Sequence, residues 1–592
     1  MSLQAALTKH VVFAIILIVI FFLSLVAFFD ISRKYSGELR EPELYHSKNS
    51  ASYTEPRKNV WADLSVLETR QLLYYLYNEP NDLNITAPGQ SNPFQNYVLS
   101  TELLRPNKTQ ALNYIDDGTS TKPPRWAHVV IFNGAGTQAT LDEYMVGPLP
   151  PTRDCEIRPL TFYHNSGRSS SPNLVPDSTS LRDWPHAIAD EISDITQSIL
   201  GSVINAGNRS DPDGLEIGFR DPWIDENGNT VSTPAEPVSK SLPKHTYTLD
   251  RENQFVSWMG FEFYMAFSAV TGVTLYDIRF NGERILYELG LQEALSHYAG
   301  SDPVQGAAKY LDSFWGMGAK MFELVQEYMD IQYSLRSRMY KHRNAICLFE
   351  YTADYPLQRH TTDSYTSISK NTYLVLRTVA VVGNYDYTID YVFYLDGSLE
   401  VKFRASGFIQ GAYYVPGLSE EYGHRVHSQF ASSLHDHVIN FKADFDILGE
   451  RNSLVSVEIE PTTVEYPWSP NEKRKTMKLN RRTVEKEVGI SWPANSASHL
   501  VVVNNESANS WGEKPGYRIM PGSGIGAPAH LTFQGSETLG RAAEWAQKDL
   551  WVSRHKDTEA RSSTPTSNFV ADDPMIDFEK FIDGENVVQE DL

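Results

Sequence analysis

The feature that most limits the folds open to this chain is a hairpin pattern in its second half. Residues 388–395 and 398–404 are rich in β-branched and aromatic residues, and Asp396-Gly397 separates them. An Asp-Gly pair between two alternating apolar runs is a strong local signal for a tight β-hairpin. Closely spaced segments of the same kind occur throughout residues 245–592. This part of the chain is therefore expected to form a large antiparallel β-sandwich.

Two smaller modules are expected before the sandwich. In residues 58–149, Ser65 and Glu68 form a capping-box pattern at the start of a leucine-rich helical run, and residues 127–132 have a strand-like composition. In residues 150–244, isoleucines recur at helical spacing before a stretch rich in Gly, Asp and Pro. The expected fold class is α+β and mainly β, with two small α+β domains followed by the sandwich.

An apolar segment near the N-terminus predicts a transmembrane helix. Residues 11–29 form an uninterrupted run of 19 apolar and small residues, which is long enough to span a bilayer core. No small-residue cleavage site is evident before Asp30, which favours an uncleaved anchor over a signal peptide. Residues 1–30 are expected to form a single-pass membrane anchor, and residues 31–57 a polar juxtamembrane linker.

Charge and composition narrow the class of function. The formal net charge of -22 argues against nucleic-acid binding, which needs a basic surface, and is compatible with attraction of cationic ligands. The only cysteines, Cys155 and Cys347, cannot supply a disulfide framework or a zinc ribbon. An extracellular or lumenal body is the expectation, which four Asn-x-Ser/Thr sequons permit, at Asn84, Asn107, Asn208 and Asn505.

A tyrosine motif lies directly before the predicted hairpin. Tyr385 belongs to an Asn-Tyr-Asp-Tyr sequence at residues 384–387, and a His-x-His pair, His435 and His437, follows 50 residues later. Alternate residues of a strand point to the same face, about 6–7 Å apart, so both imidazoles can face one ion. Imidazole suits copper. Each feature alone has an ordinary explanation, as a Tyr-rich strand or as hydrogen-bonded histidines, but together they indicate a tyrosine processed beside a metal.

These motifs resemble those of the copper amine oxidases, in particular fungal-type members, in which the first Tyr of Asn-Tyr-Asp/Glu-Tyr is oxidised to topaquinone beside copper. The segment around Asp312, with the Gly-Met-Gly sequence at residues 316–318, is similar to the family's segment that carries the catalytic base. Tyr298, 14 residues before Asp312, is similar to the tyrosine that hydrogen-bonds the quinone oxygen. The resemblance implies a site made of the cofactor tyrosine Tyr385 beside Asn384, the catalytic residues Asp312 and Tyr298, and the copper ligands His435 and His437.

The resemblance also implies a reaction. A primary amine and O2 would be the substrates, the products would be an aldehyde, hydrogen peroxide and ammonia, and the protein would be a homodimer. A carboxylate must remove a proton from the α-carbon of the substrate, and a buried carboxylate of raised pKa is suited to this near neutral pH. Asp312 is the candidate, although an isolated aspartate in such a segment is more often a turn or capping residue.

A pair of aspartates further along the same predicted strand indicates a second ion. Two carboxylates spaced as Asp-x-Asp share one strand face, an arrangement that calcium favours, although solvated charges are the commoner cause. In the family, a similar Asp-x-Asp, the carbonyl of its central residue and an Asp-Leu pair near the C-terminus hold a peripheral calcium. The resemblance therefore implies a calcium site at Asp444, Phe445, Asp446, Asp591 and Leu592.

The main departure from the family pattern concerns the third copper histidine. In the family it follows the Asp-Leu pair, whereas the sequence given ends at Leu592, and His499, His530 and His555 lack the expected context. Three protein ligands and a water make a working metal site, whereas two hold an ion weakly. The catalytic domain at residues 245–592 is expected to be incomplete at its C-terminus. A second interpretation stays open, that of a non-catalytic membrane glycoprotein that keeps the scaffold but lacks the third copper ligand.

Overall fold

The computed structural model describes residues 56–592 with internal gaps. The gaps are residues 87–94, 118–119, 173–245, 301–308, 322–327, 494–497, 522–539 and 568–569 and the single positions 408, 410, 418, 429 and 571. The predicted membrane anchor, nearly all of the predicted linker and the isoleucine pattern of the second module lie outside the described residues, so these features stay predictions. No helix in the described part is long and apolar enough to cross a membrane.

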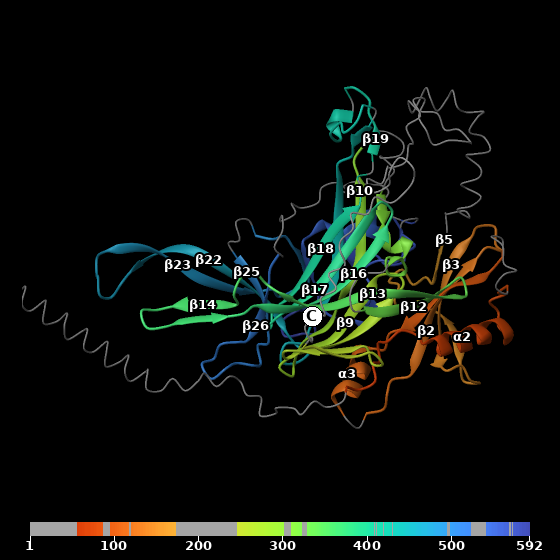
Figure 1. Cartoon of the computed structure of the whole chain (residues 1–592), viewed down its shortest axis with the longest axis horizontal. Helices are drawn as coiled ribbons and strands as arrows, with labels where there is room; N and C mark the ends of the chain where they lie inside the picture. The colour runs from red at the N-terminus through yellow and green to blue at the C-terminus, as the bar shows by residue number, and fades with distance from the viewer. Residues whose placement is uncertain are drawn as a thin grey trace, which may run out of the picture. The chain divides into compact units, whose positions relative to one another are not determined.

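The larger of two main sheets contains ten antiparallel strands (Figure 1). Their order is β18-β17-β16-β13-β12-β1-β2-β3-β4, and β5 pairs with β3. The pairing of β1 with β12 joins the strands of the first 172 residues to those of the later chain. The strands are β1 (Tyr97–Leu104), β2 (Arg125–Asn133), β3 (Thr140–Leu149), β4 (Glu156–Pro159), β5 (Ser170–Pro172), β12 (Tyr328–Leu335), β13 (Arg338–Thr352), β16 (Thr372–Val382), β17 (Tyr385–Tyr394) and β18 (Leu399–Gly407).

The second sheet has seven antiparallel strands in the order β11-β10-β9-β8-β7-β6, with β21 paired to β10. β10 is 16 residues long, which lets it pair with β9 near its start, with β11 near its end and with β21 along most of its length. The strands are β6 (Thr248–Asp250), β7 (Phe255–Trp258), β8 (Phe261–Ser268), β9 (Gly272–Phe280), β10 (Glu283–Tyr298), β11 (Lys309–Leu311) and β21 (His435–Phe445).

A shared apolar core holds the two sheets face to face. Phe263 of β8 stacks on Phe393 of β17 with ring centroids 4.5 Å apart, and both side chains are fully buried. Leu275 of β9 and Leu376 of β16 belong to the same core. Burial of such side chains stabilises the folded state by roughly 1.5–3 kcal/mol each. The prediction of a mostly β, antiparallel architecture is confirmed, while the predicted domain boundaries stay predictions.

The hairpin expected from the sequence is present. β17 pairs with β18 from Tyr385 opposite Gly407 to Phe393 opposite Leu399. Gly397 has a φ of 87°, a conformation that favours glycine, and its N–H donates to Tyr394 O at 3.0 Å. The turn therefore fixes the register that places Tyr385 at the beginning of β17.

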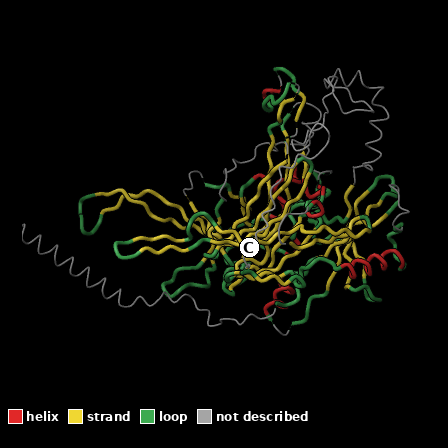
Figure 2. The backbone as a smooth tube through the Cα atoms, in the orientation of Figure 1, coloured by secondary structure: helices red, strands yellow, loops and turns green. Residues whose placement is uncertain are grey.

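Helices are few in the described chain (Figure 2). α2 (Val66–Asn78) begins with the predicted capping box, in which Ser65 and Glu68 each accept a hydrogen bond from the other's backbone N–H. Leu72 and Leu76 are buried, whereas Leu67, in the first turn, is 65% exposed. α3 (Lys108–Asp116) begins at the cap residue Asn107, whose side chain accepts from the Gln110 N–H at 2.9 Å.

The remaining strands form smaller sheets. β22 and β23 pair along most of their length and extend away from the two main sheets as a long hairpin (Figure 1). The strands are β14 (Gln358–Thr361) with β15 (Thr366–Ser369), β19 (Gly411–Tyr413) with β20 (Phe430–Ser432), β24 (Val488–Ile490) with β27 (Leu550–Val552), and β22 (Ser453–Glu465), β23 (Lys473–Thr483), β25 (Ser498–Val503) and β26 (Gly516–Ile519) in one four-stranded sheet.

Candidate functional site

The predicted site residues meet between the two main sheets. Tyr385 lies on β17 of the ten-stranded sheet. On the other sheet, Tyr298 of β10 lies directly opposite His435 of β21, and Ser296 lies opposite His437. Since side chains two residues apart share a strand face, each strand presents a pair of side chains to the same space. Residues far apart in sequence are thus brought into one cluster by strand pairing and sheet packing.

Tyr385 contacts both histidines of the predicted pair. Its hydroxyl lies 2.6 Å from His435 Nε2, and its ring meets the His437 ring edge-on with centroids 4.8 Å apart. Tyr298 stacks on the opposite histidine, with its ring centroid 4.7 Å from that of His435. Asn384 lies within hydrogen-bonding reach of Tyr298. The structure thus brings together the residues proposed for cofactor and copper, while their roles stay predictions.

The two histidines have nitrogen atoms that fit a metal ion. His435 Nδ1 donates to the Ser433 carbonyl at 2.8 Å, which leaves Nε2 as an acceptor. Burial, together with His435, lowers the pKa of His437 to about 4, so this imidazole is neutral. His437 Nε2 is buried and has no hydrogen-bond partner among the described residues. Neutral imidazoles oriented by a bond at their other nitrogen are typical metal ligands. Within the described ranges, no His, Cys, Asp or Glu completes a group of three with them.

Asp312 is a buried carboxylate beside these residues. It starts the 3-10 turn η1 (Asp312–Trp315), directly after β11, and is 2% exposed. Its Oδ2 accepts hydrogen bonds from Ser296 Oγ and Tyr387 Oη, both at 3.0 Å. Burial raises the pKa of Asp312 to about 7; the Tyr387 hydrogen bond opposes this shift, and the charge of Glu293 adds to it. A carboxylate with this pKa can accept a proton near neutral pH.

Glycines allow the segment after Asp312 to pack against β8 and β9. Gly316 has a φ of +71° and ends η1. A Cβ at Gly318 would lie 1.9 Å from the Ser268 carbonyl oxygen, so only glycine fits there. The neighbouring Met317 N–H donates to Val270 O at 2.9 Å. The Gly-Met-Gly sequence therefore fixes the turn that carries Asp312.

Three residues of the site were not predicted from the sequence. Ser296 and Tyr387 contact Asp312 and also approach His437 Nδ1, at 3.2 and 3.0 Å. Glu293 is fully buried, and it accepts the Ser313 N–H at 2.8 Å and the Ser313 hydroxyl at 2.5 Å. Burial raises the pKa of Glu293 to about 7. Strand 283–298 also carries Glu283, Glu288 and other polar residues, so no signal in the sequence alone singles out Glu293.

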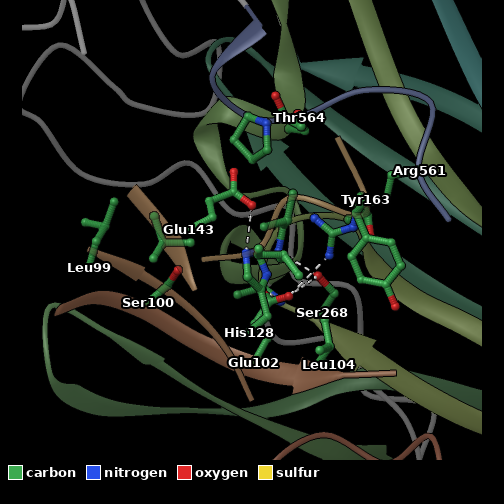
Figure 3. Close-up of a pocket in the computed structure, with 18 of the residues that line it drawn as sticks. Leu99, Ser100, Glu102, Leu104, His128, Glu143, Tyr163, Ser268, Arg561 and Thr564 are labelled. Carbon is green, nitrogen blue, oxygen red and sulfur yellow. Dashed lines mark hydrogen bonds and ion pairs between the residues drawn. The ribbon is translucent and has the colours of Figure 1, made fainter. Parts of the chain in front are cut away.

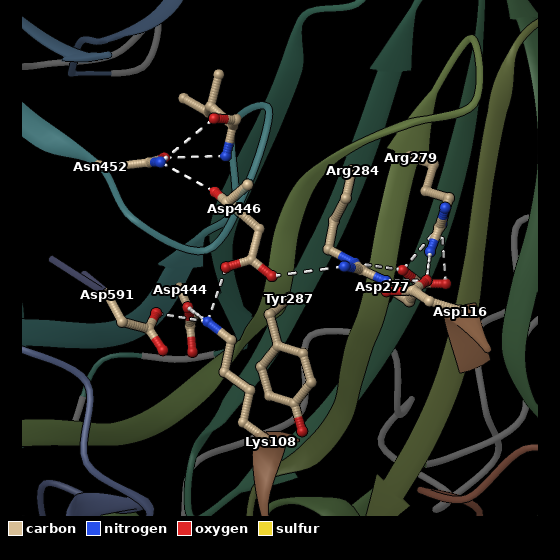
Figure 4. Close-up of polar contacts among 12 residues, drawn as sticks. Lys108, Asp116, Asp277, Arg279, Arg284, Tyr287, Asp444, Asp446, Asn452 and Asp591 are labelled. Carbon is tan, nitrogen blue, oxygen red and sulfur yellow. Dashed lines mark hydrogen bonds and ion pairs between the residues drawn. The ribbon is translucent and has the colours of Figure 1, made fainter. Parts of the chain in front are cut away.

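The residues proposed for calcium also come together, but around a lysine. The ammonium of Lys108 lies 2.7 Å from Asp444 and Asp446 and 2.5 Å from Asp591 (Figure 4). The carbonyl of Leu592 accepts the Phe445 N–H at 2.8 Å. The predicted grouping of the three carboxylates is therefore present, and the calcium ion stays a prediction at this point.

A large cavity lies beside the site around Tyr385 but does not include it. It has a volume of about 1520 Å³ and is lined by residues of both main sheets and of the segment 555–566, including Glu102, Ser268 and Arg561 (Figure 3). Its wall reaches Ser313, next to Asp312, but includes neither Asp312 nor Tyr385. On its wall, Glu143 accepts hydrogen bonds from His128 and His164, which hold its pKa below the usual range although burial would raise it.

Comparisons with known proteins agree with this geometry. Residues 248–592 match the family model described as copper amine oxidase, enzyme domain, and residues 83–154 match the model described as copper amine oxidase, N2 domain. A copper amine oxidase of Bipolaris victoriae is 34% identical, over 97% of this chain and 92% of the relative. A copper-containing diamine oxidase of Sus scrofa is 26% identical, over 90% of this chain and 84% of the relative. The crystal structure of Aspergillus nidulans amine oxidase is similar with a TM-score of 0.80 at 33% identity, covering 91% of this chain and 84% of that one. Pichia pastoris lysyl oxidase has a TM-score of 0.79 at 30% identity, covering 91% and 86%.

Proposed function

The chain belongs to the copper amine oxidase family, and we propose that it converts primary amines and O2 into aldehydes, hydrogen peroxide and ammonia. The observation that carries this proposal is the position of Tyr385, whose hydroxyl lies 2.6 Å from His435 Nε2 and whose ring packs against His437. A copper ion held by these two imidazoles would lie close enough to the Tyr385 ring to act on it.

Copper and a topaquinone made from Tyr385 are the proposed cofactors. The Nε2 atoms of His435 and His437 would hold the copper, since His435 Nε2 contacts the Tyr385 hydroxyl across the two sheets, the His437 ring packs against the Tyr385 ring, and His437 Nε2 has no hydrogen-bond partner among the described residues. When formed, the quinone supplies an electrophilic carbonyl for the amine, and the copper supports its formation from tyrosine.

The chain's own residues provide proton transfer and orientation. Asp312 would accept the proton from the α-carbon of the amine, because its pKa of about 7 leaves it largely ionised just above neutral pH. Ser296 and Tyr387 hold Asp312 Oδ2 in one orientation through two hydrogen bonds. Tyr298, stacked on His435, would orient the cofactor ring from the other side.

The test is whether Tyr385 becomes modified and whether the modified protein turns over. The purified chain is incubated aerobically with copper, the peptide containing Tyr385 is analysed by mass spectrometry, and hydrogen peroxide is measured with a primary amine. We expect a quinone mass and peroxide release for the natural sequence. Tyr385→Phe should give neither, whereas Asp312→Asn should keep the quinone and lose turnover. Unmodified Tyr385 in a folded, copper-exposed protein would refute the enzymatic proposal.

One observation favours a second candidate, a scaffold without catalysis. Among the described residues, only two potential copper ligands meet at Tyr385, and two imidazoles hold an ion more weakly than three. Copper titration distinguishes the candidates, since a non-catalytic scaffold would bind copper weakly and leave Tyr385 unmodified. We also propose a homodimer, as is typical of this family, and light scattering on the purified protein would test it.

A further inference from the structure

A buried lysine lies at the centre of the acidic cluster formed by Asp444, Asp446 and Asp591. The Lys108 ammonium donates to Asp444 Oδ1 and Asp446 Oδ1 at 2.7 Å and to Asp591 Oδ1 at 2.5 Å. The Lys108 side chain is 3% exposed and the side chains of Asp444 and Asp446 at most 1%. An ammonium group has three N–H donors, and here each of them has its own carboxylate. The cluster is therefore a filled cation site.

The position of Lys108 is fixed by the start of α3. Its backbone N–H donates to Asp557 Oδ1 at 2.8 Å, and the cap residue Asn107 donates to Asp557 Oδ2 at 2.8 Å. The side chain then passes along Tyr287, whose ring centroid lies 5.0 Å from the Lys108 nitrogen (Figure 4). Because both ends of the residue are held, the ammonium is directed into the cluster by the docking of α3.

Other cations of the chain also face the cluster. His555 Nδ1 lies 2.8 Å from Asp444 Oδ2, on the side away from Lys108, and Arg284 Nη1 lies 3.9 Å from Asp446 Oδ2. Buried carboxylates are stable only when their charge is compensated. Here Lys108 and His555 supply most of the compensation, because Arg284 lies closer to Asp277 and Asp116 than to Asp446. A divalent ion would therefore compete with Lys108 for the same carboxylate oxygens.

We propose that the Lys108 ammonium takes the place of the calcium ion that the family resemblance implies, so that this chain closes the acidic cluster without calcium. Calcium in proteins takes six to eight oxygen ligands at about 2.3–2.6 Å. An ion in contact with the same three carboxylate oxygens would overlap the ammonium, which lies 2.5–2.7 Å from them. A tethered ammonium joins α3 to β21 permanently, independently of the calcium concentration around the protein.

The test asks whether removal of the ammonium creates a calcium site. Calcium binding to the full-length protein is measured by isothermal titration calorimetry, and thermal unfolding is followed with calcium and with a chelator. We expect Lys108→Met to bind one calcium ion more than the natural sequence does. In chelator its melting temperature should fall by several degrees, and calcium should restore part of that loss. The double variant Lys108→Met/Asp591→Asn should lose the added ion.

A matched control separates this effect from loss of any lysine and from other acidic sites. Lys341→Met removes a lysine paired with Asp330 at the surface and should leave the number of bound calcium ions unchanged. Equal calcium stoichiometry in the natural protein and in Lys108→Met would overturn the proposal. If Lys108→Met fails to fold, the Asp591→Asn variant alone decides. Loss of one bound calcium ion in this variant would show that the natural cluster already holds calcium, and an unchanged number supports the ammonium.

Discussion

The hydroxyl of Tyr387 lies 3.0 Å from Asp312 Oδ2 and equally close to His437 Nδ1. The second tyrosine of the 384–387 motif therefore lies between the proposed base and a proposed copper ligand, while the first contacts His435. Ser296 Oγ lies within hydrogen-bonding distance of Asp312, Tyr387 and His437. This network connects the protonation of the base to the residues around it, and variants of the network should move the pH dependence of the reaction.

Tyr387→Phe should shift the acidic limb of the kcat/KM profile to higher pH. The Tyr387 hydroxyl stabilises the ionised form of Asp312, so its loss raises the pKa of the base above about 7. A hydrogen bond to a charged group contributes roughly 1.5–3 kcal/mol, which corresponds to a shift of about one pH unit or more. Tyr391→Phe is the matched control, since the buried Tyr391 hydroxyl donates to Val273 O instead. An unmoved limb in Tyr387→Phe, at unchanged copper content, would contradict the assignment of Asp312 as the base.

Glu293→Gln should shift the same limb in the opposite direction. The charge of Glu293 raises the pKa of Asp312, and a neutral amide removes this repulsion. The Gln carbonyl can still accept the Ser313 N–H, so the turn after Asp312 keeps its anchor. The measurement is again kcat/KM against pH, with Glu262→Gln on β8 as a control that is expected to leave the limb in place. A shift of the acidic limb to higher pH in Glu293→Gln would refute the electrostatic role of Glu293.

Asp312→Asn should make the protein more stable at alkaline pH while it removes activity. In the unfolded chain Asp312 titrates near 3.8, whereas in the folded protein its pKa is about 7. The folded state therefore binds more protons between these values, and stability falls as pH rises through them. Because the Asn side chain does not ionise, the variant does not lose this part of its free energy of unfolding, which is on the order of 2–4 kcal/mol.

Thermal unfolding of Asp312→Asn and the natural protein at pH 5 and pH 8 checks this expectation. The advantage of the variant should be larger at pH 8, and turnover should fall by about 10²–10⁴-fold, as expected for loss of a general base. If the stability of Asp312→Asn relative to the natural protein were lower at pH 8 than at pH 5, ionisation of Asp312 would not destabilise the folded protein.

Local patterns account for the elements that the sequence predicts correctly. The Asp396-Gly397 turn and the alternation around it specify the β17–β18 hairpin, and Ser65 with Glu68 specifies the start of α2. Each of these signals lies within a few residues of the structure that it determines. Leu67 is 65% exposed although it belongs to the same leucine-rich helix, because helical spacing alone does not specify which face of a helix docks on the sheet.

Long-range docking accounts for what the sequence does not reveal. Ser296 and His437 are 141 residues apart, and only the pairing of β10 with β21 places them opposite each other. In the sequence, Lys108 has no feature that distinguishes it from other residues at the beginning of a helix. Its role emerges only when α3 is docked, 336 residues from Asp444 in sequence, so the resemblance indicated calcium where the fold supplies an ammonium.

Gly318→Ala should lower both stability and turnover, because the added methyl group has no room. Its Cβ would lie 1.9 Å from the Ser268 carbonyl oxygen and 2.9 Å from the Gly272 nitrogen, and both are backbone atoms of the β8–β9 connection. The turn must move away, and Asp312 moves with it. Overpacking of this kind destabilises by about 1–3 kcal/mol, and a displacement of about 1 Å at a reacting group can lower the rate by about 10²-fold. Thermal unfolding and kcat measure the two effects, with Gly136→Ala as the control, since the nearest atom there is 3.4 Å away. A Gly318→Ala enzyme with natural stability and kcat would show that the turn is free to shift without displacing the base.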